Sequence, residues 1–270
     1  MNSIMRYVHK PSIQSTVFAP LGFLILPIIL VTLSWLANIA APAKLQFPKP
    51  LLVFGEVVRS LAEPKVLSAI EATLFTLGQA LIISLLLGVT VGLFLGLSKY
   101  VWNLSQPTID FFRSIPVTFL IPGSALLMGV SSPHIIWVLA TYPCFLILVF
   151  NVRAGISKQE PERVHSFYII SGSTNLVRRF LKVTFFEILP DIFAGFRIAL
   201  SYGLVIVTVL EYMKLGKSDG IGSLIYDELN ALNYVRVYAL TFMVGGLGFA
   251  LNKLVEMLQN MLVHWSDEKL

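Results

Sequence analysis

The feature that most constrains the fold of this chain is a series of long apolar runs. Runs of about 20 residues carry almost no charge, and a helix of about that length crosses the ~30 Å hydrocarbon layer of a bilayer. Only 13% of the residues are charged, against about 25% in soluble domains. We therefore predict six membrane spans, at residues 17–40, 69–97, 113–130, 134–151, 187–211 and 235–262.

Each span is expected to be helical, because lipid offers no partner to unpaired backbone N–H and C=O groups. The runs are too long and too uniformly apolar for the alternating strands of a membrane barrel. The predicted fold class is an all-α integral membrane protein. Residues 17–265 would form one transmembrane domain, preceded by an N-terminal segment, 1–16, and followed by a short tail, 266–270.

The first apolar run, 17–41, is much longer than the ~7–15-residue core of a signal peptide, so we expect an uncleaved span. Six spans place both termini on one side. The segments on that side, with the loop at 152–186, carry the larger share of Lys and Arg, which predicts that they are cytoplasmic. The net charge of +5 is then a property of the loops and does not indicate nucleic-acid binding.

The longest basic segment between two apolar runs is 163–190, RVHSFYIISGSTNLVRRFLKVTFFEILP. It is too polar to lie in lipid and too aromatic to be a simple tether. We predict that it forms a short cytoplasmic docking helix for a soluble partner, between the fourth and fifth spans.

Two further patterns concern packing. Residues 47–66 interleave apolar and charged positions and are too short to span, so they predict an amphipathic helix in the outer interface. Gly88, Gly92 and Gly96 recur every four residues in the second span, a spacing that lets two membrane helices approach closely.

Enzyme chemistry is poorly supported. Cys144 is the only cysteine and the four histidines are scattered, so no metal site is predicted. Gly216-Lys217-Ser218 resembles the end of a phosphate loop, but Glu211 stands where that loop needs a glycine. We expect no catalytic residue and no cofactor on this chain, so any energy for work must come from another chain.

Charged and polar residues in or near the spans are the candidates for a translocation pathway. Arg113 begins the predicted third span, and Pro116 and Pro122 follow it and would bend that helix. Arg197 and Tyr202 lie in the fifth span, and Glu211 lies at its far end. The arginines can instead form structural ion pairs, with Asp110, Glu187 or Asp191 as possible partners.

Five segments occur in a recognisable order: FPKPLLV (47–53), the second span from Thr73 to Tyr100, RSIPVTFLIP (113–122), LPDIFAGFRIALSYGLVIVTVLEYM (189–213) and DGIGSLIYDE (219–228). In this order they resemble the inner-membrane permease subunits of binding-protein-dependent ABC importers, in the nitrate, sulfonate and taurine branch. The resemblance runs from about Phe47 to Trp265, which is most of the chain.

The resemblance implies two permeases that form a pore, two ATPases that bind ATP and Mg²⁺ below it, and an extracytoplasmic binding protein that delivers the solute. The segment 163–190 stands where the family places its ATPase-coupling helix. The family pattern there, Glu-Ala-Ala and then glycine, falls on Phe167, Tyr168, Ile169 and Ser173, with Gly172 beside it. This departure implies either a matching apolar groove on the ATPase or a second, different permease that keeps the motif.

The resulting hypothesis is an importer permease for a small solute, with an anion such as nitrate, a sulfonate or taurine favoured by Arg113 and Arg197. The alternative is a secondary transporter driven by an ion gradient. It is less favoured, because the sequence shows neither a pair of repeats nor an acidic cluster in mid-membrane. An intramembrane enzyme would need a nucleophile–base or metal-ligand arrangement, which the spans do not show.

Overall fold

The computed structural model describes residues 48–159 and 183–263, together with Ile29, Thr32, Leu33, Leu36, Ile39 and Ile169. Within these ranges every regular element is a helix, which confirms the all-α prediction for this part of the chain. Most of the predicted first span lies outside the described residues, as do residues 163–182 of the docking segment apart from Ile169, including Phe167, Tyr168, Gly172 and Ser173.

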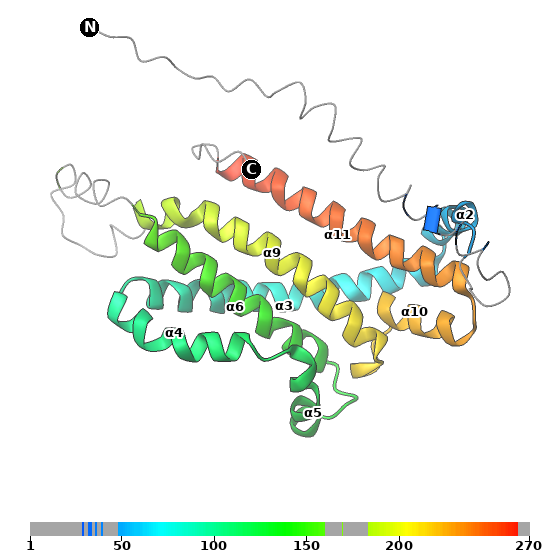
Figure 1. Cartoon of the computed structure of the whole chain (residues 1–270), viewed down its shortest axis with the longest axis horizontal. Helices are drawn as coiled ribbons and strands as arrows, with labels where there is room; N and C mark the ends of the chain where they lie inside the picture. Colours follow the sequence, from blue (N-terminus) through cyan, green and yellow to red (C-terminus); the bar gives the residue numbers. More distant parts are fainter. Residues whose placement is uncertain are drawn as a thin grey trace, which may run out of the picture.

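In the part of the chain that the structure describes, four helices are long and apolar enough to cross a membrane: α3 (Pro64–Gly96), α6 (Ile135–Ser157), α9 (Phe185–Tyr212) and α11 (Tyr234–Leu262). They agree with the predicted second, fourth, fifth and sixth spans, although α6 continues six residues beyond the predicted end at 151. Figure 1 shows them running lengthwise through the molecule. Their apolar faces form the main core, to which Leu81, Leu148 and Leu204 contribute.

The predicted third span at 113–130 differs from the structure. Arg113 ends one helix, α4 (Lys99–Arg113), and a second helix, α5 (Val117–Met128), follows at an angle of 86°. Pro116 is the N-cap of α5 and has extended backbone angles. The break follows from this proline, because the residue before a proline is disfavoured in helical conformation and proline itself donates no hydrogen bond. This bent pair is the only candidate for a fifth span among the described residues.

The glycine row of α3 faces a matching row on α6. A Cβ atom added to Gly88 would lie 2.6 Å from the Cβ of Leu148, and one added to Gly92 would lie 2.8 Å from the Cβ of Val152. Gly96 meets Ile156 one turn further on. The two rows share a four-residue spacing, so the backbones approach closely over three successive turns.

Helices α6 and α9 also pack through glycines, one from each helix. Gly155 on α6 faces Asp191, and Gly195 on α9 faces Asn151; an added Cβ would lie 2.9 Å and 2.6 Å from those side chains. Each helix thus supplies one glycine that makes room for a side chain of the other. Helix α6 packs closely against both α3 and α9, and these contacts position the polar groups described below.

Two short helices lie near one end of the bundle: α2 (Pro50–Leu61) and α10 (Ile221–Asn230). Helix α2 occupies the middle of the predicted amphipathic segment 47–66, with Val53 and Ser60 buried and Leu51 and Val58 exposed. Helix α10 falls in the stretch DGIGSLIYDE and follows a short 3-10 turn, η2 (Leu215–Lys217), in which Gly216 has a φ of 67°.

Candidate functional site

Arg113 is the last residue of α4, and its side chain reaches α6. Its guanidinium is 3.3 Å from the carboxylate of Asp110 and stacks over the ring of Phe150, 4.6 Å from the centroid. A second pair lies beside it, because Trp102 contacts the same Phe150 ring edge-on and carries Arg153 on its face, 5.1 Å from the centroid. The ion pair of Arg113 with Asp110, which the sequence left open as an alternative to a pathway role, is therefore present. Both arginines also connect α4 to α6 through aromatic rings.

Arg197 pairs with a residue that the sequence did not suggest. Its guanidinium lies 3.6 Å from Oε2 of Glu256 on α11, and the other oxygen, Oε1, lies 2.7 Å from the ammonium of Lys253. Neither Glu187 nor Asp191 is its partner in an ion pair of the described chain. Asp191 instead pairs with Lys158 at 2.8 Å, where α6 ends and α9 begins.

The contact between α9 and α11 continues with neutral polar groups. The amide of Asn252 donates a hydrogen bond of 2.8 Å to Oγ of Ser201 and one of 3.0 Å to the carbonyl of Gly248. Tyr202, next to Ser201, is more than half exposed. We call Arg197, Ser201, Asn252, Lys253 and Glu256 the polar seam.

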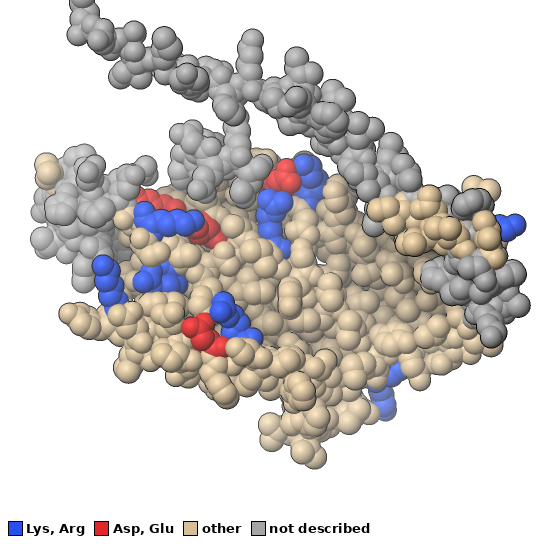
Figure 2. Space-filling model, viewed as in Figure 1, with Lys and Arg blue, Asp and Glu red and all other residues tan. Residues whose placement is uncertain are grey.

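The sequence contained a signal for this seam. Asn252, Lys253 and Glu256 interrupt an apolar run at positions that share one side of a helix, and ionisable residues inside spans mark functional sites by default. Figure 2 shows how sparse such groups are, since uncharged residues cover most of this face of the molecule.

Glu211 is fully buried at the end of α9, where it meets two other helices. Its carboxylate accepts hydrogen bonds from the hydroxyl of Thr73 on α3 at 2.8 Å and from the backbone N–H of Gly222 on α10 at 3.2 Å. The oxygen of Thr73 in turn accepts the N–H of Ile221 at 2.9 Å. The structure thus brings Glu211 to the N-terminus of α10, and its predicted place on a pathway stays a prediction.

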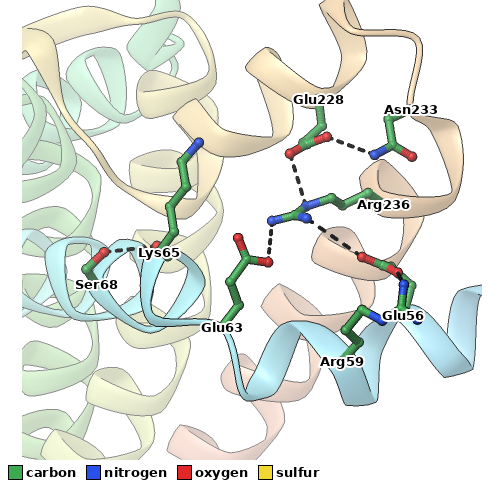
Figure 3. A network of polar contacts seen from close by, with 8 residues as sticks. All are labelled: Glu56, Arg59, Glu63, Lys65, Ser68, Glu228, Asn233 and Arg236. Carbon is green, nitrogen blue, oxygen red and sulfur yellow. Dashed lines mark hydrogen bonds and ion pairs between the residues drawn. The ribbon is translucent and has the colours of Figure 1, made fainter.

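A second polar junction holds the other end of α10 (Figure 3). Arg236, near the start of α11, lies 2.6 Å from Glu63, 3.0 Å from Glu228 on α10 and 3.9 Å from Glu56 on α2. All three carboxylates point toward one guanidinium that is only 17% exposed. Arg236 was not singled out from the sequence, because two of its partners, Glu56 and Glu63, lie far away along the chain.

One apolar cavity of about 400 Å³ opens between α3 and the first turns of α9. Its walls include Val89, Leu189 and Phe193, and its polar side chain, Thr90, donates its hydroxyl hydrogen to the carbonyl of Leu86. The described residues that line the cavity present almost entirely apolar surface, which does not suit a small polar solute or ordered water. The cavity is therefore separate in chemistry from the polar seam.

The chain is similar to the bicarbonate transport system permease protein of Synechococcus elongatus, with 27% identity over 71% of this chain and 68% of that protein. The taurine transport system permease protein of Escherichia coli is 24% identical over 89% of this chain and 88% of its own length. Among solved structures, an inward-facing conformation of the MetNI methionine ABC transporter gives a TM-score of 0.57 at 17% identity, covering 74% of this chain and 95% of that one.

A family model also covers most of the chain, residues 84–265, and its description is "Binding-protein-dependent transport system inner membrane component". The match includes α6, α9 and α11 with the polar seam. The chain belongs to this family of inner-membrane permease components of binding-protein-dependent transport systems.

Proposed function

We propose that this chain is the membrane subunit of an importer for a small oxyanion or organic anion, and that it forms the translocation pathway together with a second permease copy. The observation that supports an anionic solute is the polar seam, where Arg197 and Lys253 share the carboxylate of Glu256 between two candidate spans. Relatives point the same way, because bicarbonate is an oxyanion and taurine carries a sulfonate.

The energy would come from a separate ATPase that binds ATP and Mg²⁺. In this chain Gly216-Lys217-Ser218 lies in a 3-10 turn between two helices, and the N–H of Gly216 donates to the carbonyl of Val130. A phosphate loop instead follows a strand and directs its backbone N–H groups at phosphate. The turn therefore fits a structural connection and not a nucleotide site.

The orientation follows from the charge bias, with both termini and the loop at 152–186 in the cytoplasm. The ATPase would then dock on Phe167, Tyr168, Ile169, Gly172 and Ser173. The opposite end of the bundle, with α2 and α10, would face the extracytoplasmic binding protein. The second permease would be either an identical copy or a homologue that keeps the small-residue coupling motif.

The test is recovery of the complex from its native host membrane with a tag on this chain. We expect an ATPase that carries a phosphate loop to be recovered with it in a ratio near one to one. Cells should then take up labelled nitrate, bicarbonate or taurine only when the ATPase keeps its phosphate-loop lysine. Uptake by liposomes that contain this chain alone, driven by an ion gradient, would instead establish a secondary transporter.

A further inference from the structure

The polar seam carries an excess of positive charge. Glu256 is the one carboxylate that the described residues supply to it, and its two oxygens contact two different cations, Arg197 and Lys253. One unit of positive charge is therefore left over. Lys253 presents much of it, because its side chain is 56% exposed whereas that of Arg197 is 28% exposed.

The seam lies within the length of two candidate spans. Arg197 is twelve residues into α9, which places it about 18 Å from the near end of the helix and about 22 Å from the far end. Lys253 lies on α11, about 14 Å from the end of that helix at Leu262. A charge within a span is costly unless it faces water or a counter-ion.

The neutral groups of the seam are bonded to one another and to the backbone. Ser201 donates its hydroxyl hydrogen to the carbonyl of Arg197 at 3.2 Å and accepts a hydrogen bond from Asn252, whose other N–H is donated to the carbonyl of Gly248. Lys253 has three ammonium donors, of which the contact to Glu256 uses one. A partly exposed ammonium with donors to spare can bind a carboxylate, sulfonate, nitrate or bicarbonate group.

We infer that the polar seam is an anion-binding station on the translocation pathway, in which Lys253 binds the solute, Arg197 adds positive potential, and Glu256 keeps the affinity low enough for release. The inference rests on the proposed function for its place in transport. The binding of anions by the seam is a separate property, which can be measured on the chain without substrate, ATP or partner.

The experiment uses the full chain with Ser201→Cys as a reporter thiol. The natural Cys144 is fully buried and contacts the carbonyl of Ala199, so the unmodified chain provides the blank. The probes are two methanethiosulfonate reagents of similar size, one with a sulfonate and one with a trimethylammonium group. Each rate is divided by the rate with a small free thiol in solution.

We expect the anionic reagent to be favoured by roughly tenfold over the cationic one after this correction, because a site with surplus positive charge concentrates anions. Lys253→Gln should bring the ratio close to one, and Lys253→Arg should keep it. Glu256→Gln should raise it further. Arg59→Gln, on an exposed side chain of α2, should leave it unchanged.

A ratio that Lys253→Gln does not change, or a thiol that neither reagent reaches, would overturn the anion station. If the importer assignment is wrong but the seam binds anions, cells will show no solute uptake while the Ser201→Cys thiol still reacts preferentially with the anionic reagent. If Lys253→Gln abolishes uptake while the reagent ratio stays the same, Lys253 is needed for transport for another reason and the station is rejected.

Discussion

The guanidinium of Arg236 on α11 lies 2.6 Å from the carboxylate of Glu63, the residue between α2 and α3. The two residues are 173 positions apart, so the pair connects the beginning and the end of the described bundle. Glu56 and Glu228 approach the same guanidinium from α2 and α10. One side chain therefore joins four helical segments at the end opposite the predicted coupling loop.

Replacing Arg236 with Gln should destabilise the protein, because three carboxylates would face one another without a cation. Breaking a buried ion pair costs about 3–5 kcal/mol, and since these groups are partly exposed we expect about 2 kcal/mol. This corresponds to a fall in Tm of about 4–8 °C, measured by thermal unfolding in detergent. The matched control is Arg59→Gln, whose side chain is 83% exposed and should shift Tm little. Equal effects of the two changes would contradict the role given to Arg236.

Gly92→Ala should lower the stability of the α3–α6 contact. The added methyl would lie 2.8 Å from the Cβ of Val152 and 3.1 Å from the carbonyl oxygen of Val149, so the helices must separate at a cost of about 1–3 kcal/mol. The control is Gly78→Ala on the same helix, where an added Cβ meets nothing within 4 Å. That change should leave Tm unchanged or raise it, because alanine is the better helix former. A tolerated Gly92→Ala would show that α3 and α6 separate at little cost.

Thr73→Val should weaken the junction of α3, α9 and α10. It removes a donor to the buried carboxylate of Glu211 and an acceptor for the N–H of Ile221, at about 1–3 kcal/mol for each buried group left unpaired. Thr73→Ser keeps the hydroxyl and should recover most of the stability. Thr76→Val, on the same helix, removes only a bond to the carbonyl of Ala72 and serves as the control. We would compare the Tm of all three in detergent, and similar values for Thr73→Val and Thr76→Val would count against the junction.

Replacing both Phe167 and Tyr168 with Asp should uncouple the ATPase, because two charges would enter an apolar docking groove. We expect the variant to insert in the membrane with normal Tm, to lose ATPase recovery by more than tenfold, and to lose uptake. Exchanging Phe111 and Tyr100, two exposed aromatics of α4, for Asp serves as the control. Wild-type uptake by the Phe167/Tyr168 variant would remove the docking role from this segment.

The apolar runs were sufficient to predict four of the long helices. The predicted and observed ends agree best where a turn bounds the helix, as at Asn233 before α11. The third span could not be placed the same way. Residues 99–113 contain Lys99, Pro107 and Asp110, so no apolar run indicates α4. Pro116 was recognised as a bend, but a proline alone does not tell a kink within one helix from an 86° break between two.

The polar groups were harder to predict than the helices. Arg197 was singled out as a pathway residue, but its partner Glu256 is 59 positions away and is chosen by the packing of α9 on α11. Glu211 was placed near the end of the fifth span as expected, yet its burial depends on Thr73 and on the position of α10, which local sequence does not encode. The packing of Gly88, Gly92 and Gly96 was suggested by their spacing alone; which helix they meet was not.

The glycine row of α3 also constrains how the length of this protein can change during evolution. An inserted residue between Gly88 and Gly92 would rotate everything beyond it by about 100° and turn a bulky side chain toward Val152. A deletion would rotate it equally in the other direction. Changes in length should therefore be excluded from the three turns of α3 that face α6.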